Sequence, residues 1–290
     1  MRKYAQGGFG HMVSVHNFSY GLLTPALGYV MSCLGCFLGL RCTTRARALS
    51  GKARARWLLL AAVSIATTGI WVMHFIAMLG FTIPDQTVRY NVPVTILSML
   101  IAFIVVGIGL LIVGFGGEGI GPLLLGGLII GCGVASMHYI GMAAMRMPDS
   151  MSYNTPLFVL SVIIAVVAGT AALWAALRLT SVWSTLTASL IMGVAVSGMH
   201  YTGMAAMRVH GVQSPGMAAS MPGGVSAVSF LLPLILGISI LAFVLTAVIS
   251  LSPTAAEIHE DAALMARIAA PPQETTAPPQ QRGLWGSLRA

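Results

Sequence analysis

Seven long apolar segments, each without a single Asp, Glu, Lys or Arg, make up most of this chain. A helix that crosses a bilayer needs about 20 consecutive apolar residues, and each segment reaches that length. Lipid offers no hydrogen-bond partners to the backbone, so such segments must be helical. The sequence therefore predicts an all-α integral membrane protein with seven transmembrane helices. The predicted spans are Ser19–Leu40, Trp57–Leu79, Pro93–Phe115, Pro122–Met145, Leu157–Leu177, Trp183–Met207 and Ser229–Leu251.

Charge is scarce and unevenly placed. Only 8% of the residues are charged, against roughly 25% in soluble domains, which excludes a water-soluble globular enzyme. The net charge of +8 could suggest nucleic acid as a partner, but the distribution of the cations indicates the lipid bilayer instead. Six of the 15 basic residues lie between the first two spans, which predicts a cytoplasmic loop there, with the N-terminus outside and the C-terminus inside. These six are Arg41, Arg45, Arg47, Lys52, Arg54 and Arg56.

The spans divide the chain into three parts. Residues 1–18 are expected to be an extracytoplasmic segment without a cleavable signal peptide, because they contain no continuous apolar core. Residues 19–251 form the membrane domain. Residues 252–290, rich in Pro and Gln, are expected to form a disordered cytoplasmic tail too short for an enzymatic output domain. The chain is therefore predicted not to be an enzyme. All four cysteines (Cys33, Cys36, Cys42 and Cys132) are expected to be reduced.

An internal repeat lies on the second, fourth and sixth predicted helices. The segments 73–78, 137–142 and 199–204 read MHFIAM, MHYIGM and MHYTGM. Their histidines (His74, His138 and His200) are separated by 64 and 62 residues, so the repeat unit is a helical hairpin. The hairpins that follow open similarly, with YNVP at 90–93 and YNTP at 153–156. Three hairpins and one closing helix account for the seven spans.

The three histidines are expected at one depth in the membrane. His138 and His200 each precede an arginine by eight residues, which places them roughly 12 Å below the outer boundary at 1.5 Å per residue. A methionine follows each histidine at i+4, on the same helix face. These are Met78, Met142 and Met204, with Met145 and Met207 as weaker additions at i+7. Gly141 and Gly203, and Ala77 in the first copy, are small enough to let helices approach closely.

Ionisable residues inside a membrane are functional candidates by default. Imidazole and thioether groups form a soft, uncharged donor set that suits copper, Cu(I) above all. Three histidines at one depth could form one shared site or three separate ones. The alternative is structural: buried histidines that only hydrogen bond between helices, and methionines that fill the core. Tyr139 and Tyr201 could be ligands or interfacial anchors, and His16 could cap the site or be an ordinary loop residue.

The sequences Met137-His138-Tyr139-Ile140 and Met199-His200-Tyr201-Thr202, with Met73-His74-Phe75-Ile76 as a divergent copy, resemble the MHYT-domain family. The resemblance covers roughly residues 16–251 and implies a multi-pass sensor of the bacterial plasma membrane. It also implies detection of oxygen, carbon monoxide or nitric oxide through copper near the outer face. The ligand candidates carried over by the resemblance are Met73, His74, Met78, Met137, His138, Tyr139, Met142, Met199, His200, Tyr201 and Met204. Phe75 departs from the motif, because it offers no phenolic ligand.

Several functions remain open from the sequence. The first is a copper-binding sensor that binds a diatomic gas and signals to a separate cytoplasmic protein. The second is a copper transport or delivery protein, which would need ligands along its whole path. The third is a haem protein with two axial histidines. A retinal photoreceptor is excluded, because no lysine follows Lys52.

Overall fold

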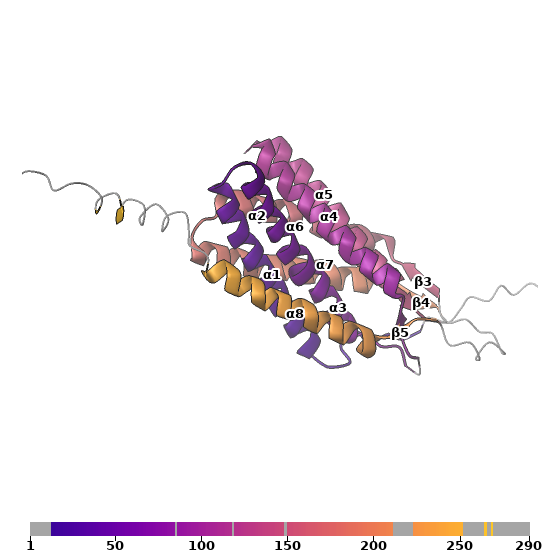
Figure 1. Cartoon of the computed structure of the whole chain (residues 1–290). Helices are drawn as coiled ribbons and strands as arrows, with labels where there is room; N and C mark the ends of the chain where they lie inside the picture. The colour runs from indigo at the N-terminus through magenta and orange to yellow at the C-terminus, as the bar shows by residue number, and fades with distance from the viewer. Residues whose placement is uncertain are drawn as a thin grey trace, which may run out of the picture. The chain divides into compact units, whose positions relative to one another are not determined.

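The computed structural model describes residues 13–84, 86–117, 119–147, 150–210 and 223–251, together with Leu264, Met265 and Ile268. The chain divides into two units, Met1–Ser252 and Pro253–Ala290. The first unit is a helical bundle (Figure 1). Its helices are α1 (Leu23–Arg47), α2 (Gly51–Val63), η1 (Ser64–Val72), α3 (Met73–Leu79), α4 (Val92–Gly116), α5 (Ile120–Ala143), α6 (Thr155–Arg178), α7 (Val182–Ala206) and α8 (Ala227–Leu251). Most residues of the predicted N-terminal segment and of the predicted tail lie outside the described residues.

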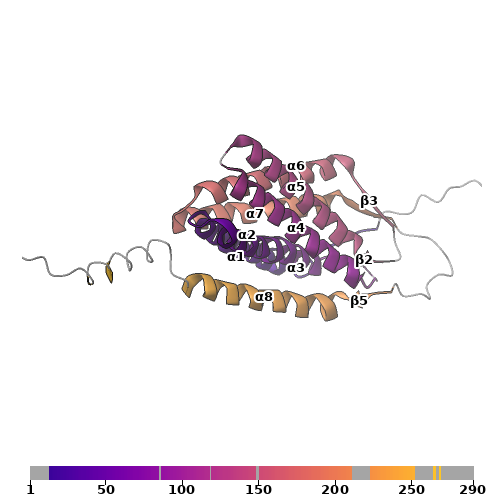
Figure 2. The ribbon, with the colours of Figure 1, turned by 45° about the horizontal axis from the view of Figure 1, so that its top comes forward.

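Six helical rods are long and apolar enough to cross a membrane, and the π-helix η1 joins α2 and α3 into one of them, Gly51–Leu79. The other five are α1, α4, α5, α6 and α7. The seventh predicted span corresponds to α8, whose residues Ala227–Ala242 count as a shorter apolar helix among the described residues. It packs along α1, η1 and α3 on one side of the bundle (Figure 2).

The basic segment differs from the prediction. Only residues 48–50 connect α1 to α2, and the six cations lie within these helices rather than in a loop. Arginine and lysine favour helices, so the helices continue beyond the apolar runs. Three arginines donate to carbonyl groups at the C-terminal ends of other helices: Arg45 to Ile249, Arg47 to Leu177 and Leu179, and Arg54 to Gly114. They satisfy carbonyls that a helix end leaves without an intrahelical partner.

Short strands gather at the opposite end of the bundle. They are β1 (Arg89–Tyr90), β2 (Met145–Arg146), β3 (Ser150–Tyr153), β4 (Met207–His210) and β5 (Val225–Ser226). One sheet has the order β2-β1-β5, with Arg89 opposite both Arg146 and Ser226. The other sheet pairs β3 with β4, from Ser150 opposite His210 to Tyr153 opposite Met207. The strands thus connect the loops that follow α3, α5 and α7.

Two helices begin in the same way after these strands. Asn91 accepts a hydrogen bond from the amide of Val94 at the start of α4, and Asn154 accepts one from the amide of Leu157 at the start of α6. A proline follows within the first turn of each helix, where its missing N–H has no cost. The backbone N–H groups of Asn91 and Asn154 in turn donate to the backbone carbonyl oxygens of Ala144 and Ala206, which lie just beyond the second and third histidine motifs. The end of the second motif and the end of the third are therefore each hydrogen bonded to the start of their own hairpin.

Candidate metal centre

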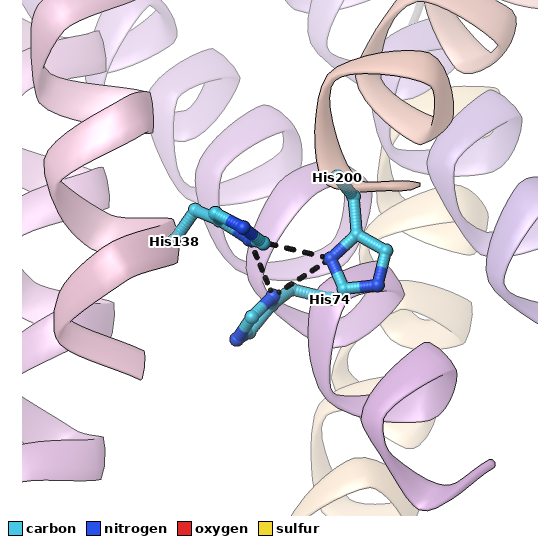
Figure 3. A group of neighbouring side chains, drawn as sticks. All are labelled: His74, His138 and His200. Carbon is cyan, nitrogen blue, oxygen red and sulfur yellow. Dashed lines mark hydrogen bonds between the residues drawn. The ribbon is translucent and has the colours of Figure 1, made fainter. Parts of the chain in front are cut away.

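Three helices of the bundle each place one histidine at the same level. His74 lies on α3, His138 on α5 and His200 on α7, each five or six residues before its helix ends. The three side chains are at most 1% exposed. Figure 3 shows the rings converging from three directions on one small region between the helices.

The convergence involves the same atom of each ring. The Nδ1 atoms of His74 and His200 are 3.0 Å apart, those of His74 and His138 3.1 Å, and those of His138 and His200 3.3 Å. They form a nearly equilateral triangle (Figure 3). The rings meet edge to face, with centroids 4.9–5.0 Å apart. This cluster, called the histidine triad below, is the one group of His, Cys, Asp or Glu side chains among the described residues with metal-site spacing.

Protons alone cannot satisfy this triangle. Each neutral imidazole offers at its Nδ1 either one N–H or one lone pair in the ring plane. Each of the three short contacts needs a hydrogen on one atom and a lone pair on the other. Each of the three Nδ1 atoms is either protonated or unprotonated, so at least two of the three must be in the same state. At least one of the contacts therefore brings two lone pairs, or two N–H groups, against each other. A cation among the three nitrogens removes the conflict, because all three lone pairs can then bind it.

The spacing also fits a metal ion. Three nitrogens bound at about 2.0 Å in a tetrahedral arrangement lie about 3.3 Å from one another. The observed separations of 3.0–3.3 Å are close to this value. The Nε2 atoms of His74 and His138 are buried and have no hydrogen-bond partner. These two rings therefore lack the outer acceptor that usually orients a metal-bound histidine, and packing must hold them instead.

Two glycines provide that packing. A Cβ added to Gly141 on α5 would lie 2.6 Å from Nε2 of His74, and one added to Gly203 on α7 would lie 2.3 Å from Nε2 of His138. Each ring thus rests against the glycine of the following motif. The sequence predicted that these glycines let helices approach closely; in the structure, each of them leaves room for a histidine ring.

All six predicted methionine ligands are buried. Met73, Met137 and Met199 precede the histidines, and Met78, Met142 and Met204 follow them by one helical turn; none is more than 3% exposed. Residues at i+4 share the histidine face of each helix, whereas those at i−1 point about 100° away. Met145 and Met207 do not continue this helical stripe, since α5 and α7 end at Ala143 and Ala206 and both methionines begin strands.

Phe75, Tyr139 and Tyr201 each pack against a histidine of the triad, whereas His16 lies apart from it. The hydroxyl group of Tyr139 is 2.6 Å from that of Ser161 on α6, and its ring packs on Phe158. Tyr201 packs on Phe18, with ring centroids 5.4 Å apart. Phe75, which replaces the motif tyrosine, packs edge-on against His74. His16 is exposed and pairs through its backbone with Thr82, outside the triad.

The four cysteines are free, as predicted. Cys36 and Cys42 are buried in α1, whereas Cys33 is half-buried and Cys132 on α5 is exposed. None of them belongs to the triad, which contains three histidines and no thiol. Only Cys36 and Cys42 belong to the hydrophobic core of the described structure.

Comparison with known proteins identifies the repeat. The family described as "Bacterial signalling protein N terminal repeat", MHYT, matches residues 68–126 and 131–189. These ranges contain His74 and His138, and the third motif at 199–204 follows them. No solved structure matches the chain significantly.

The relatives are longer signalling proteins. The bifunctional diguanylate cyclase/cyclic di-GMP phosphodiesterase MucR of Pseudomonas aeruginosa is 37% identical over 193 residues, or 65% of this chain and 28% of that protein. The cyclic di-GMP phosphodiesterase NbdA of the same organism is 37% identical over 200 residues, or 67% of this chain and 25% of that protein. The signalling protein YkoW of Bacillus subtilis is 27% identical over 195 residues, or 65% of this chain and 24% of that protein. The matched region thus spans about a quarter of each relative.

Proposed function

Because this chain belongs to the MHYT family of bacterial membrane signalling proteins, we propose that its histidine triad binds one copper ion as the detector of a sensory module. The module is a multi-pass protein of the bacterial plasma membrane. The observation that supports copper binding is the convergence of three buried Nδ1 atoms within 3.3 Å of one another.

The surroundings favour Cu(I) over a divalent ion. The triad residues are neutral donors in an apolar interior, where each additional unit of charge is costly. A single positive charge held by three imidazoles therefore suits the site better than a double one. Met78, Met142 and Met204, on the same helix faces one turn toward the strands, are candidates for thioether ligands. Bound copper would supply a coordination position for a diatomic gas such as oxygen, carbon monoxide or nitric oxide.

The output would lie on the side of the basic residues. Arg45, Arg47 and Arg54 connect the α1–α2 turn to the ends of α8, α6 and α4. A change at the triad that shifts α3, α5 or α7 would reach this end through the helix rods. We propose that a cytoplasmic signalling partner reads the shift there. The names of MucR and NbdA suggest cyclic di-GMP turnover as the regulated activity.

The two alternatives have less support. Copper transport needs ligands along a path, whereas the cavity one turn inward from the triad is lined almost entirely by apolar side chains. Haem ligated by two histidines would need the macrocycle between their nitrogens. Three Nδ1 atoms within 3.3 Å leave no space for one between them.

Copper loading tests the proposal. We expect detergent-purified protein, loaded anaerobically with Cu(I), to retain one copper per chain, to lack a Soret band, and to show an infrared carbonyl stretch under carbon monoxide. Retention of no copper would overturn the proposal. Iron with a Soret band would indicate a haem protein instead, and copper flux in proteoliposomes would indicate a transporter.

The orientation can be tested separately. In a cysteine-free background, we expect Ser152→Cys on β3 to react with a membrane-impermeant maleimide in intact spheroplasts. Lys52→Cys on α2, at the other end of the bundle, should react only after permeabilisation, because cations are retained on the cytoplasmic side. Both positions are exposed. The reverse labelling pattern would place the triad near the cytoplasmic face.

A further inference from the structure

A partly enclosed apolar cavity of about 40 Å³ lies between the helices of the bundle. Side chains from α1, η1, α4, α5, α6 and α7 line it. A single water needs roughly 10–15 Å³, so this volume is about three times larger. Water also needs two to four polar partners, and here the lining offers only the Cys36 thiol beyond carbon and thioether groups. The cavity therefore favours an apolar guest.

The cavity is aligned with the histidine triad. Ile70, Val134 and Val196 line it, and each precedes a triad histidine by four residues. In the α-helices α5 and α7, positions i and i+4 lie on the same face, about 6 Å apart along the axis. Ile70 lies near the end of the π-helix η1 and lines the cavity as well. Each histidine thus has an apolar residue of the cavity wall about one helical turn away, on the side opposite the strands. Met199, directly before His200, also lines the cavity.

The wall formed by α6 and α7 contains several small side chains, beside the larger Leu173, Met192 and Met199. Ala168 and Ala172 on α6 and Ala195 on α7 line the cavity and are partly exposed. Their neighbours Val167 and Val194 are 63% and 61% exposed on the outside of these two helices. In a bilayer, that outside is lipid, in which small apolar molecules dissolve better than in water.

We propose that this cavity binds a small apolar molecule of diatomic size, admits it from the lipid between α6 and α7, and delivers it to the histidine triad. Binding in the cavity depends only on volume and apolarity, so it holds with or without metal. Delivery rests on the copper site proposed above. The class of ligand follows from the size of the cavity and the lack of strong polar groups.

Xenon tests the binding step in metal-free protein. We expect the methyl resonances of Ile70, Val134 and Val196 to shift saturably under xenon pressure in nanodiscs. Ala168→Leu should fill the cavity and weaken xenon binding by about tenfold or more. Val167→Leu, on the lipid-facing side of the same helix, is the matched control and should behave like wild type. Absence of a saturable shift in wild type, or an unchanged shift in Ala168→Leu, would overturn the proposal.

Gas kinetics test the delivery step in copper-loaded protein. After flash photolysis, we expect carbon monoxide to rebind about tenfold more slowly in Ala168→Leu than in Val167→Leu, at equal copper content. Ala195→Leu, on α7, repeats the test should Ala168→Leu not fold. Unchanged rebinding with impaired xenon binding would overturn delivery alone. A protein that binds xenon and no copper would refute the copper proposal and leave the cavity site intact.

Discussion

Replacing His138 by Leu is expected to abolish tight copper binding without weakening the fold. Loss of a partner that merely orients a metal ligand already costs 10- to 100-fold in affinity, so loss of one of three ligands should cost at least about 100-fold. The metal-free protein should be as stable as wild type or more so. Leucine removes a buried ring whose Nε2 has no hydrogen-bond partner and whose Nδ1 takes part in an unsatisfiable triangle.

Competition with a Cu(I) chelator measures the affinity, and thermal unfolding in detergent measures the stability. His16→Leu is the matched control, because His16 is exposed outside the triad. His74→Leu and His200→Leu should have effects similar to His138→Leu, since the three nitrogens are nearly equivalent. Loss of one third of the copper in each variant would instead reveal three separate sites. Full copper content in the triple variant would place the ligands elsewhere.

The second large effect is expected from a single added methyl group. In Gly203→Ala, the new Cβ would stand 2.3 Å from Nε2 of His138, so the ring must move. A side chain can move at little cost to folding, but the displaced Nδ1 leaves the triangle. We expect copper affinity to fall by about 10- to 100-fold, with little change in thermal unfolding of the metal-free protein.

Gly198→Ala provides the control on the same helix, because a Cβ there meets nothing within 4 Å. Gly141→Ala should act like Gly203→Ala, through the ring of His74. Equal copper affinity in wild type and Gly203→Ala would mean that the position of the His138 ring does not matter for the metal. A large loss of stability with unchanged affinity would assign the glycine to helix packing alone.

The sequence determined the helices and the level of the histidines. Apolar runs of this length must be helical in lipid, because only a helix satisfies its own backbone. The spacing of the three motifs then brought His74, His138 and His200 to the same level of the bundle. The residues at which the helices begin and end were predicted less well. Cationic residues predicted in a loop belong to α1 and α2, because the sequence records where polarity changes and not where the hydrogen-bonded helix stops.

Only the tertiary structure decided what the histidines do at that level. Whether three rings meet, and through Nδ1 rather than Nε2, depends on the rotation of α3, α5 and α7 about their axes. That rotation is fixed by contacts between helices, such as the rings of His74 and His138 against Gly141 and Gly203. The cavity beneath the triad has the same origin. The sequence shows that an apolar residue stands four positions before each histidine. An unfilled volume, however, depends on how side chains from six helices pack together, so no single helix determines it.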